Sequence, residues 1–166
     1  MKETGDNKKG ASREVMLPYA LRLLGRRARS VAEIRQALQK KEAEPELIEA
    51  VIGELKELKF LNDLEFARSW VRSRDRVSPR GEFRLRQELL EKGIAKDLIS
   101  QVLAERKEAA GEDEGMSEFE LAQQVAETRS RSYSHLPVEA RRRRLAGFLQ
   151  RRGFSIDTIS RILKEG

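Results

Sequence analysis

The strongest constraint on the fold is a pattern that the chain repeats. The stretch AEIRQALQKKEAEPELIEAVI, residues 32–52, aligns with FRLRQELLEKGIAKDLISQVL, residues 83–103, after a shift of 51 residues. Both contain Arg-Gln-x-Leu, and in both a second apolar pattern begins nine residues after that leucine. A further shift of 60 residues gives a third copy, which includes Leu145, Leu149 and Gly153. Self-similarity of this kind is the sequence signature of a repeat architecture.

Each copy is preceded by another apolar segment with a common spacing. The segments are YALRLL (19–24), FARSWV (66–71) and LAQQVA (121–126). Apolar residues at i, i+1, i+4 and i+5 lie on one face of an α-helix, so each copy is predicted to contain three helices. Because Trp70 aligns with Leu23 in the first copy, we expect its side chain to lie in the core.

Signals for helix ends agree with this division. Ser30-x-x-Glu33 and Ser117-x-x-Glu120 have the pattern of capping boxes, in which each side chain binds the backbone N–H of the other residue. Asn62 or Asp63 can cap the helix that carries FARSWV.

The repeated turn after the second helix also has a residue preference. Gly93 and Gly153 occupy one aligned position, where a left-handed backbone is wanted at a helix C-terminus. Glu42 stands there in the first copy, so we expect that turn to differ or to be strained.

We therefore expect an all-α protein, a tandem array of three three-helix repeats that is elongated and either straight or curved. A single repeat buries too little surface to fold stably alone, and stacking of the repeats buries additional apolar surface between them. The expected organisation is a disordered polar tail (1–14), repeat 1 (15–61), repeat 2 (62–105), an acidic flexible linker (106–117) and repeat 3 (118–166).

The residue types argue against catalysis. The chain has no cysteine and one histidine, His135, and it lacks a phosphate-binding glycine loop. We expect no enzymatic activity, no metal and no cofactor. No apolar run approaches the roughly 20 residues that span a bilayer, and the N-terminus does not resemble a signal peptide. We expect a cytoplasmic protein without a membrane partner.

Arginine is the feature that points to a partner. The net charge is +6, and positive charge is concentrated in residues 66–86 and 119–166, whereas 42–65 and 105–118 are acidic. Guanidinium groups bind phosphates and carboxylates through paired hydrogen bonds, although some will pair with glutamates of the chain itself. The candidate binding residues are Arg26, Arg27, Arg29, Arg68, Arg72, Arg74, Arg76, Arg80, Arg84, Arg86, Arg141, Arg142, Arg143, Arg144, Arg151 and Arg152.

These stretches resemble a known family. YALRLLGRRARSVAEIRQALQKK (19–41), VIGELKELKFLNDLEFARSWVRSR (51–74) and RGEFRLRQELLEKGI (80–94) are similar to the RecX family of recombination regulators. The resemblance is most specific at Asn62-Asp63-x-x-Phe66-Ala67 and at 86–93. Departures from the family pattern are Phe60, where a Gly-Tyr pair is usual after the lysine, and the missing turn glycine of repeat 1.

The resemblance implies tandem three-helix repeats, which the residues indicate independently. It also implies binding to the RecA recombinase and its filament on DNA. The expected effect is modulation, in most cases inhibition, of the recombinase, ATPase and coprotease activities in DNA repair and the SOS response. We expect a monomer, with single-stranded DNA as an additional candidate partner.

Two other functions agree with parts of the sequence. A repressor-like module that binds DNA directly would suit the basic charge and the helix–turn–helix-like spacing. However, the predicted third helices carry Glu46, Glu49 and Glu54 in repeat 1 and Asp97 and Glu105 in repeat 2, which is the wrong sign for a DNA groove. A metal-dependent nuclease has only Glu54-Leu55-Lys56 in its favour, and this triplet falls within a predicted helix rather than on a strand.

Overall fold

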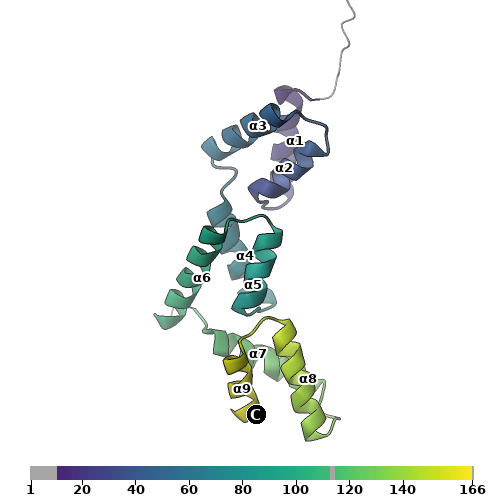
Figure 1. Ribbon diagram of the computed structural model, residues 1–166, viewed down its shortest axis with the longest axis vertical. Helices are drawn as coiled ribbons and strands as arrows, with labels where there is room; N and C mark the ends of the chain where they lie inside the picture. Colours follow the sequence, from purple (N-terminus) through teal and green to yellow (C-terminus); the bar gives the residue numbers. More distant parts are fainter. Residues whose placement is uncertain (1–10, 113–114, 166) are drawn as a thin grey trace, which may run out of the picture. The chain divides into compact units, whose positions relative to one another are not determined.

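The computed structural model describes residues 11–112 and 115–165, and this part of the chain is built from nine α-helices (Figure 1). They form three consecutive groups of three, which confirms the all-α fold of three three-helix repeats. The helices are α1 (Arg13–Arg26), α2 (Val31–Gln39), α3 (Pro45–Glu57), α4 (Asp63–Val77), α5 (Glu82–Glu91), α6 (Lys96–Gly111), α7 (Glu118–Arg131), α8 (Val138–Arg151) and α9 (Ile156–Glu165).

By its internal contacts the chain divides into two units. Unit 1 holds the residues up to Phe66 together with Lys92–Ile94, and unit 2 holds Ala67–Glu91 together with the residues from Ala95 onward. Repeat 1 therefore lies in unit 1, and most of repeat 2 and all of repeat 3 lie in unit 2. The expected elongated outline stays a prediction.

Two expected boundaries differ from the observed helix ends. Helix α1 begins at Arg13, within the tail expected over 1–14, whose first ten residues lie outside the described part. Helix α6 continues to Gly111, so the first residues of the expected linker 106–117 are helical. A physical reason is the anchoring of Arg106, which donates to both carboxylate oxygens of Asp75 at 2.9 and 2.8 Å and to the Arg80 carbonyl at 3.1 Å.

Apolar side chains at helical spacing form the core of each repeat. In unit 1, Ile34 and Leu38 of α2 meet Val51, Ile52 and Leu55 of α3, and all five side chains are at most 1% exposed. Full burial of such a side chain contributes about 1.5–3 kcal/mol relative to exposure. These residues are the apolar positions of the repeated pattern, so the pattern marks the core.

One small residue recurs where the first helix of each repeat is packed. Ala20, Ala67 and Ala122 occupy aligned positions and are all 0% exposed. Because alanine has only a methyl side chain, it allows the neighbouring helices to approach closely. In repeat 3 Ala122 belongs to the cluster formed by α7, α8 and α9, with Leu121, Leu145 and Leu149.

The predicted side-chain caps of α2, α4 and α7 are present. Both capping boxes are present: Ser30 accepts from the Glu33 N–H and Ser117 from the Glu120 N–H, with the reciprocal glutamate contacts. At α4 the two candidate caps have different partners. Asn62 Oδ1 accepts from the N–H groups of residues 64 and 65, whereas Asp63 Oδ1 accepts from the Val31 N–H at 2.8 Å.

A hydrogen bond between the N-terminus of one helix and the turn after another helix occurs once in each unit. In unit 1, Ser30 Oγ, at the N-terminus of α2, donates to the Lys92 carbonyl at 2.6 Å. A Cβ atom on the next residue, Gly93, would overlap the Ala32 side chain. In unit 2, the Gly81 N–H, at the N-terminus of α5, donates to the Arg152 carbonyl at 3.0 Å.

Glycine is required in these turns for two reasons. Gly93 and Gly153 have φ values of 74° and 81°, in the left-handed region that side chains disfavour. A Cβ atom on Gly153 would in addition overlap the backbone of Arg84. The turn after the second helix thus packs against the start of the second helix of the preceding repeat.

In the corresponding turn of repeat 1, Glu42 takes the place of the glycine. Glu42 adopts φ 56° in this turn and is exposed, so no neighbouring backbone excludes its side chain. The left-handed conformation alone costs about 1–2 kcal/mol. Lys59 has φ 60° as well, and the sequence carries no repeat signal for this second strained position.

Glu33 links three parts of unit 1, and this predicts a pH dependence. It accepts paired hydrogen bonds from Arg27 at 3.0 Å and one from Lys92 Nζ at 2.9 Å. Burial opposes its ionisation, but the hydrogen bonds from Arg27 and Lys92 outweigh burial and lower the pKa from 4.5 to about 2. The stabilisation is therefore complete above pH 4.5 and is lost as the pH falls towards 2.

We expect urea midpoints of the wild-type protein to fall over this pH range and those of Glu33→Gln to fall less. At neutral pH the variant should lose about 1 kcal/mol, because Arg27 and Lys92 lose their carboxylate partner and solvent screening limits the cost. Glu46→Gln, on an exposed side chain, is the control and should follow the wild-type profile. Parallel profiles for Glu33→Gln and the wild type would contradict the assignment.

Candidate functional site

The candidate arginines fall into two classes according to their partners. One class has partners within its own unit: Arg27, Arg29, Arg68, Arg74, Arg80, Arg84, Arg86, Arg142 and Arg152. For the other class the described residues provide no hydrogen bond or ion pair: Arg26, Arg72, Arg76, Arg141, Arg143, Arg144 and Arg151. Within the first class, Arg29, Arg142 and Arg152 donate only to neutral oxygens, so their charges, like those of the second class, are not neutralised by the described residues.

The densest group of paired arginines surrounds Glu88 of α5. This carboxylate is only 7% exposed. Its Oε2 accepts from Arg74 Nε at 2.8 Å and from Trp70 Nε1 at 2.9 Å. Its Oε1 lies 3.6 Å from Arg80 Nε and 3.4 Å from Arg84 Nε. One buried negative charge thus holds three positive charges from α4, α5 and the segment between them.

These neighbours set the ionisation of Glu88. Burial raises the pKa of its carboxyl group, but the hydrogen bonds from Trp70 and Arg74 and the charges of Arg74 and Arg80 outweigh burial, so the pKa is lowered from its ordinary value. The carboxylate therefore remains charged at neutral pH. Its role is to hold the arginines in place by electrostatic attraction.

The prediction that Trp70 is a core residue is wrong. The side chain is half-buried, and the Arg74 guanidinium lies 4.6 Å from the centroid of its ring. An indole N–H needs a hydrogen-bond acceptor when it is buried, and Glu88 supplies one. The sequence carried a signal for this pair. In repeat 1 the positions aligned with Trp70 and Glu88 hold Leu23 and Ala37, whose side chains cannot form such a hydrogen bond.

Other arginines of repeat 2 are also paired. Arg68 binds both carboxylate oxygens of Glu105, at 2.8 and 2.7 Å, and these hydrogen bonds, with one from Gln101, lower the Glu105 pKa to about 2. Arg86 pairs with Glu82 at 3.0 Å within α5. Arg68 and Arg72 lie four residues apart on α4, but only Arg68 has a carboxylate across from it.

The arginines of repeat 1 lie close to the end of α1. Arg27 is paired with Glu33, and Arg29 Nε donates to the Leu23 carbonyl at 3.4 Å. Arg26 is exposed in the last turn of α1. This group therefore presents one arginine without a described partner.

In repeat 3 the run Arg141–Arg144 is divided between different surfaces of α8. Arg142 Nη2 donates to the Leu163 carbonyl at 2.7 Å, where it satisfies a free carbonyl near the C-terminus of α9. Arg143 and Arg144 are exposed, as is Arg151, which lies seven residues after Arg144 on the same side of the helix.

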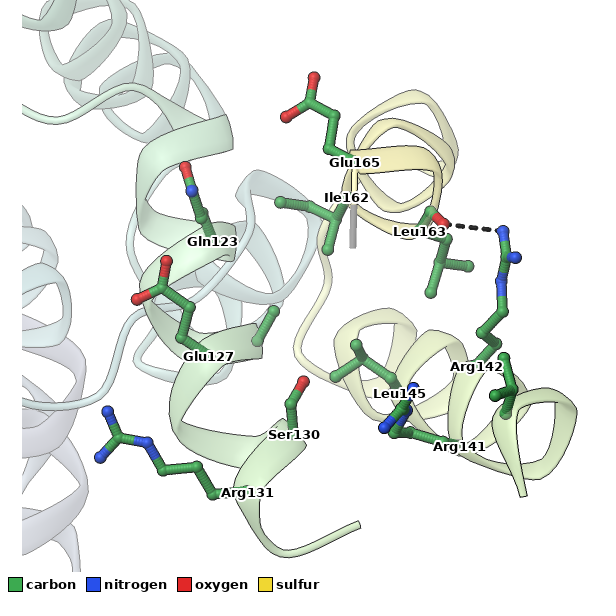
Figure 2. A pocket seen from close by; sticks show the side chains of 12 residues that line it. Gln123, Glu127, Ser130, Arg131, Arg141, Arg142, Leu145, Ile162, Leu163 and Glu165 are labelled. Atoms are coloured by element: carbon green, nitrogen blue, oxygen red, sulfur yellow. Dashed lines mark hydrogen bonds between the residues drawn. The ribbon is translucent and has the colours of Figure 1, made fainter. Parts of the chain in front are cut away.

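A pocket of about 580 Å³ lies between the three helices of repeat 3. Figure 2 shows Leu145 of α8 and Ile162 of α9 pointing into it, opposite Gln123 and Ser130 of α7. Arg141 and Arg142 both come from α8, and Arg142 donates to the Leu163 carbonyl (Figure 2). The lining therefore combines apolar side chains with polar and charged ones.

Two further findings bear on the class of protein. Within residues 11–112 and 115–165, no helix is both long enough and apolar enough to cross a membrane. The same residues contain no group of three or more histidine, cysteine or acidic side chains placed to bind a metal ion.

Comparison with known proteins covers all three repeats. Residues 19–55, 62–103 and 117–163 match the first, second and third three-helix domains of RecX, respectively. A regulatory protein RecX of Pelodictyon phaeoclathratiforme is 34% identical over 161 residues, which are 97% of this chain and 91% of that protein. A regulatory protein RecX of Pseudomonas tolaasii is 36% identical over 146 residues, or 87% and 86% of the two chains.

A solved structure supports the fold. The crystal structure of RecX from Lactobacillus salivarius superimposes with a TM-score of 0.76 over 92% of this chain and 95% of that chain, at 24% identity. The three domain matches and the relatives that align along most of their length establish the family. The chain belongs to the RecX family of regulatory proteins.

Proposed function

We propose that this protein binds the filament that the RecA recombinase forms on single-stranded DNA and inhibits its recombinase, ATPase and coprotease activities. The observation that carries the proposal is that RecX domain matches extend over all three repeats. RecA is the partner that the family resemblance implies. The protein would act as a monomer in the cytoplasm, by binding and not by catalysis.

The exposed arginines supply a physical basis for such binding. Arg72 and Arg76 lie one turn apart on α4, and Arg144 and Arg151 lie on one side of α8. None of these guanidinium groups has a partner among the described residues. Binding an acidic protein surface or a phosphate through them would therefore break no internal ion pair.

Three repeats in one chain also favour binding to a filament. A filament presents the same surface on each protomer, and linked binding modules engage such surfaces at a high effective concentration. Individually weak contacts can then hold the protein in place. Far fewer copies of this protein than RecA protomers would then suffice to stop filament growth or to block access of a DNA strand to the filament.

The first test is the DNA-dependent ATPase of RecA on single-stranded DNA, with this protein titrated in below one copy per RecA. The wild-type protein should inhibit in that range. The double variant Arg144→Glu/Arg151→Glu should need about ten times more protein for half-inhibition, equivalent to about 1.4 kcal/mol of lost binding. Reversal of two exposed charges should change folding stability by no more than about 0.5 kcal/mol each.

Arg13→Gln is the matched control, because Arg13 is an exposed arginine whose charge is neutralised by Glu54 at 2.7 Å. It should inhibit like the wild type. Equal inhibition by the double variant would remove α8 from the binding surface. If the wild-type protein leaves the ATPase unchanged but binds bare DNA tightly with a steep salt dependence, the direct DNA-binding alternative would replace this proposal.

A further inference from the structure

A second pocket in unit 2 lies where the end of α4 meets α7 and α8. Its volume is about 460 Å³, and its lining includes Arg76, Gln124, Thr128, Arg129, Phe148 and Arg152. The described part of the lining holds three arginines and no carboxylate. The remaining polar groups are neutral amides and hydroxyls.

Stacking holds two of these arginines in position. The guanidinium carbons of Arg129 and Arg152 each lie 5.0 Å from the centroid of the Phe148 ring. Arg129 Nε also donates to the Tyr133 hydroxyl at 3.0 Å. Two positive charges are therefore fixed beside one aromatic ring, which stabilises cations but does not neutralise them.

The other contacts of Arg152 leave its charge unbalanced. It donates to Ser78 Oγ at 3.0 Å and to the Pro79 carbonyl at 3.2 Å, both of which are neutral acceptors. Burial lowers its pKa, and the charges of Arg80 and Arg129 lower it further. A fold that places like charges together without a counter-ion is suited to receive an anion.

The adjacent Glu88 cluster does not supply that counter-ion. Its single carboxylate is already shared by three arginines. In addition, Arg80 Nε is buried and has no hydrogen-bond partner among the described residues. Neither the described lining nor the Glu88 cluster therefore supplies a free carboxylate for the arginines of the pocket.

We infer that the pocket lined by Arg76, Arg129 and Arg152 is a phosphate site, and that its phosphate belongs to the backbone of a nucleic-acid single strand. Guanidinium groups with nearby amide and hydroxyl donors are the usual contacts to backbone phosphates. Arg76 is also one of the arginines proposed above to bind RecA, but the phosphate site does not depend on RecA.

One observation favours a strand over an isolated phosphate ion, and a second indicates how the strand would be recognised. Arg72 lies one turn before Arg76 on α4 and is exposed, so it can contact a neighbouring phosphate outside the pocket. The Phe148 ring is already covered by two guanidinium groups, so the pocket does not offer it for base stacking. Recognition should therefore be of the backbone and independent of base sequence.

The test uses the full chain without RecA and the double variant Arg76→Gln/Arg129→Gln. Arg131→Gln is the matched control, because Arg131 is exposed on the same helix as Arg129 but does not line this pocket. Inorganic phosphate should raise the melting temperature of the wild type and the control above the value in chloride at equal ionic strength. The double variant should lose most of this increment, whatever its own melting temperature.

Fluorescence anisotropy with labelled oligo(dT) tests the source of the phosphate. Loss of two phosphate contacts should raise the Kd about tenfold and reduce the slope of log K against log salt by about 1.4. The control should keep the wild-type Kd and slope.

If inorganic phosphate raises the melting temperature of the double variant as much as that of the wild type, the proposed site is wrong. A lost increment with unchanged oligo(dT) binding would overturn the assignment to a nucleic-acid strand in favour of free phosphate. Binding of polyglutamate, but not oligo(dT), through the same two arginines would overturn it in favour of an acidic protein.

Discussion

Replacement of Gly153 by alanine is expected to lower the free energy of unfolding of the protein by about 3 kcal/mol. The residue has φ 81°, and a side chain in the left-handed region costs about 1–2 kcal/mol. The new Cβ atom would also overlap the backbone N and Cα of Arg84 at the start of α5, and overpacking of this kind costs about 1–3 kcal/mol. Urea unfolding followed by circular dichroism measures the difference.

A second glycine provides a control with the opposite sign. Gly53 lies within α3 and has no atom near its hypothetical Cβ, so Gly53→Ala should raise the free energy of unfolding by about 0.5–1 kcal/mol. Gly81→Ala should behave like Gly153→Ala, because its Cβ would overlap the Gly153 carbonyl. Wild-type stability in Gly153→Ala would show that the turn and the N-terminus of α5 do not pack as closely as described.

Replacement of Glu88 by glutamine is expected to cost about 2–4 kcal/mol. Removal of one partner from a buried ion pair typically costs about 3–5 kcal/mol, because the remaining charge is left uncompensated. Three arginines would lose their shared carboxylate here, but their side chains are 23–41% exposed, and solvent screening reduces the cost. Urea unfolding at pH 7 gives the difference.

Three comparisons make this prediction specific to charge. Glu91→Gln, on an exposed residue of the same helix, should change stability by less than about 0.5 kcal/mol. The double variant Glu88→Gln/Arg84→Gln should recover part of the loss, since one repelling charge is removed. Because the pKa of Glu88 is lowered, the difference between the wild type and Glu88→Gln should be full above pH 4.5 and shrink as the pH falls below it. Additive effects of the two substitutions would contradict the shared-carboxylate arrangement.

The repeat pattern predicted the fold because it reports local and periodic properties. The spacing i, i+1, i+4 and i+5 puts Ala20, Ala67 and Ala122 on the apolar face of their helices, and all three are fully buried. The capping boxes at α2 and α7 depend on residues three apart, so sequence spacing is sufficient to identify them. The glycines at positions 93 and 153 were recognised from backbone preference, but the backbone contacts that also require them were not.

The arginines show where such reasoning ends. Arg68 and Arg72 are both arginines of α4 and lie four residues apart on one face of the helix, so the sequence predicts the same role for both. The structure pairs Arg68 with Glu105, 37 residues away, and provides no such partner for Arg72 among the described residues. Trp70 was assigned to the core because its aligned residues are apolar, and the deciding partner, Glu88, lies 18 residues away on another helix.

The sequence by itself therefore determined the helices, their caps, their apolar faces and the three-fold repetition, because these depend on residues within one or two turns of each other. The tertiary structure decided which arginines are neutralised, which remain available to a partner and where positive charge accumulates beside Phe148. Ion pairing depends on distances between side chains of different helices, and packing of the helices sets those distances.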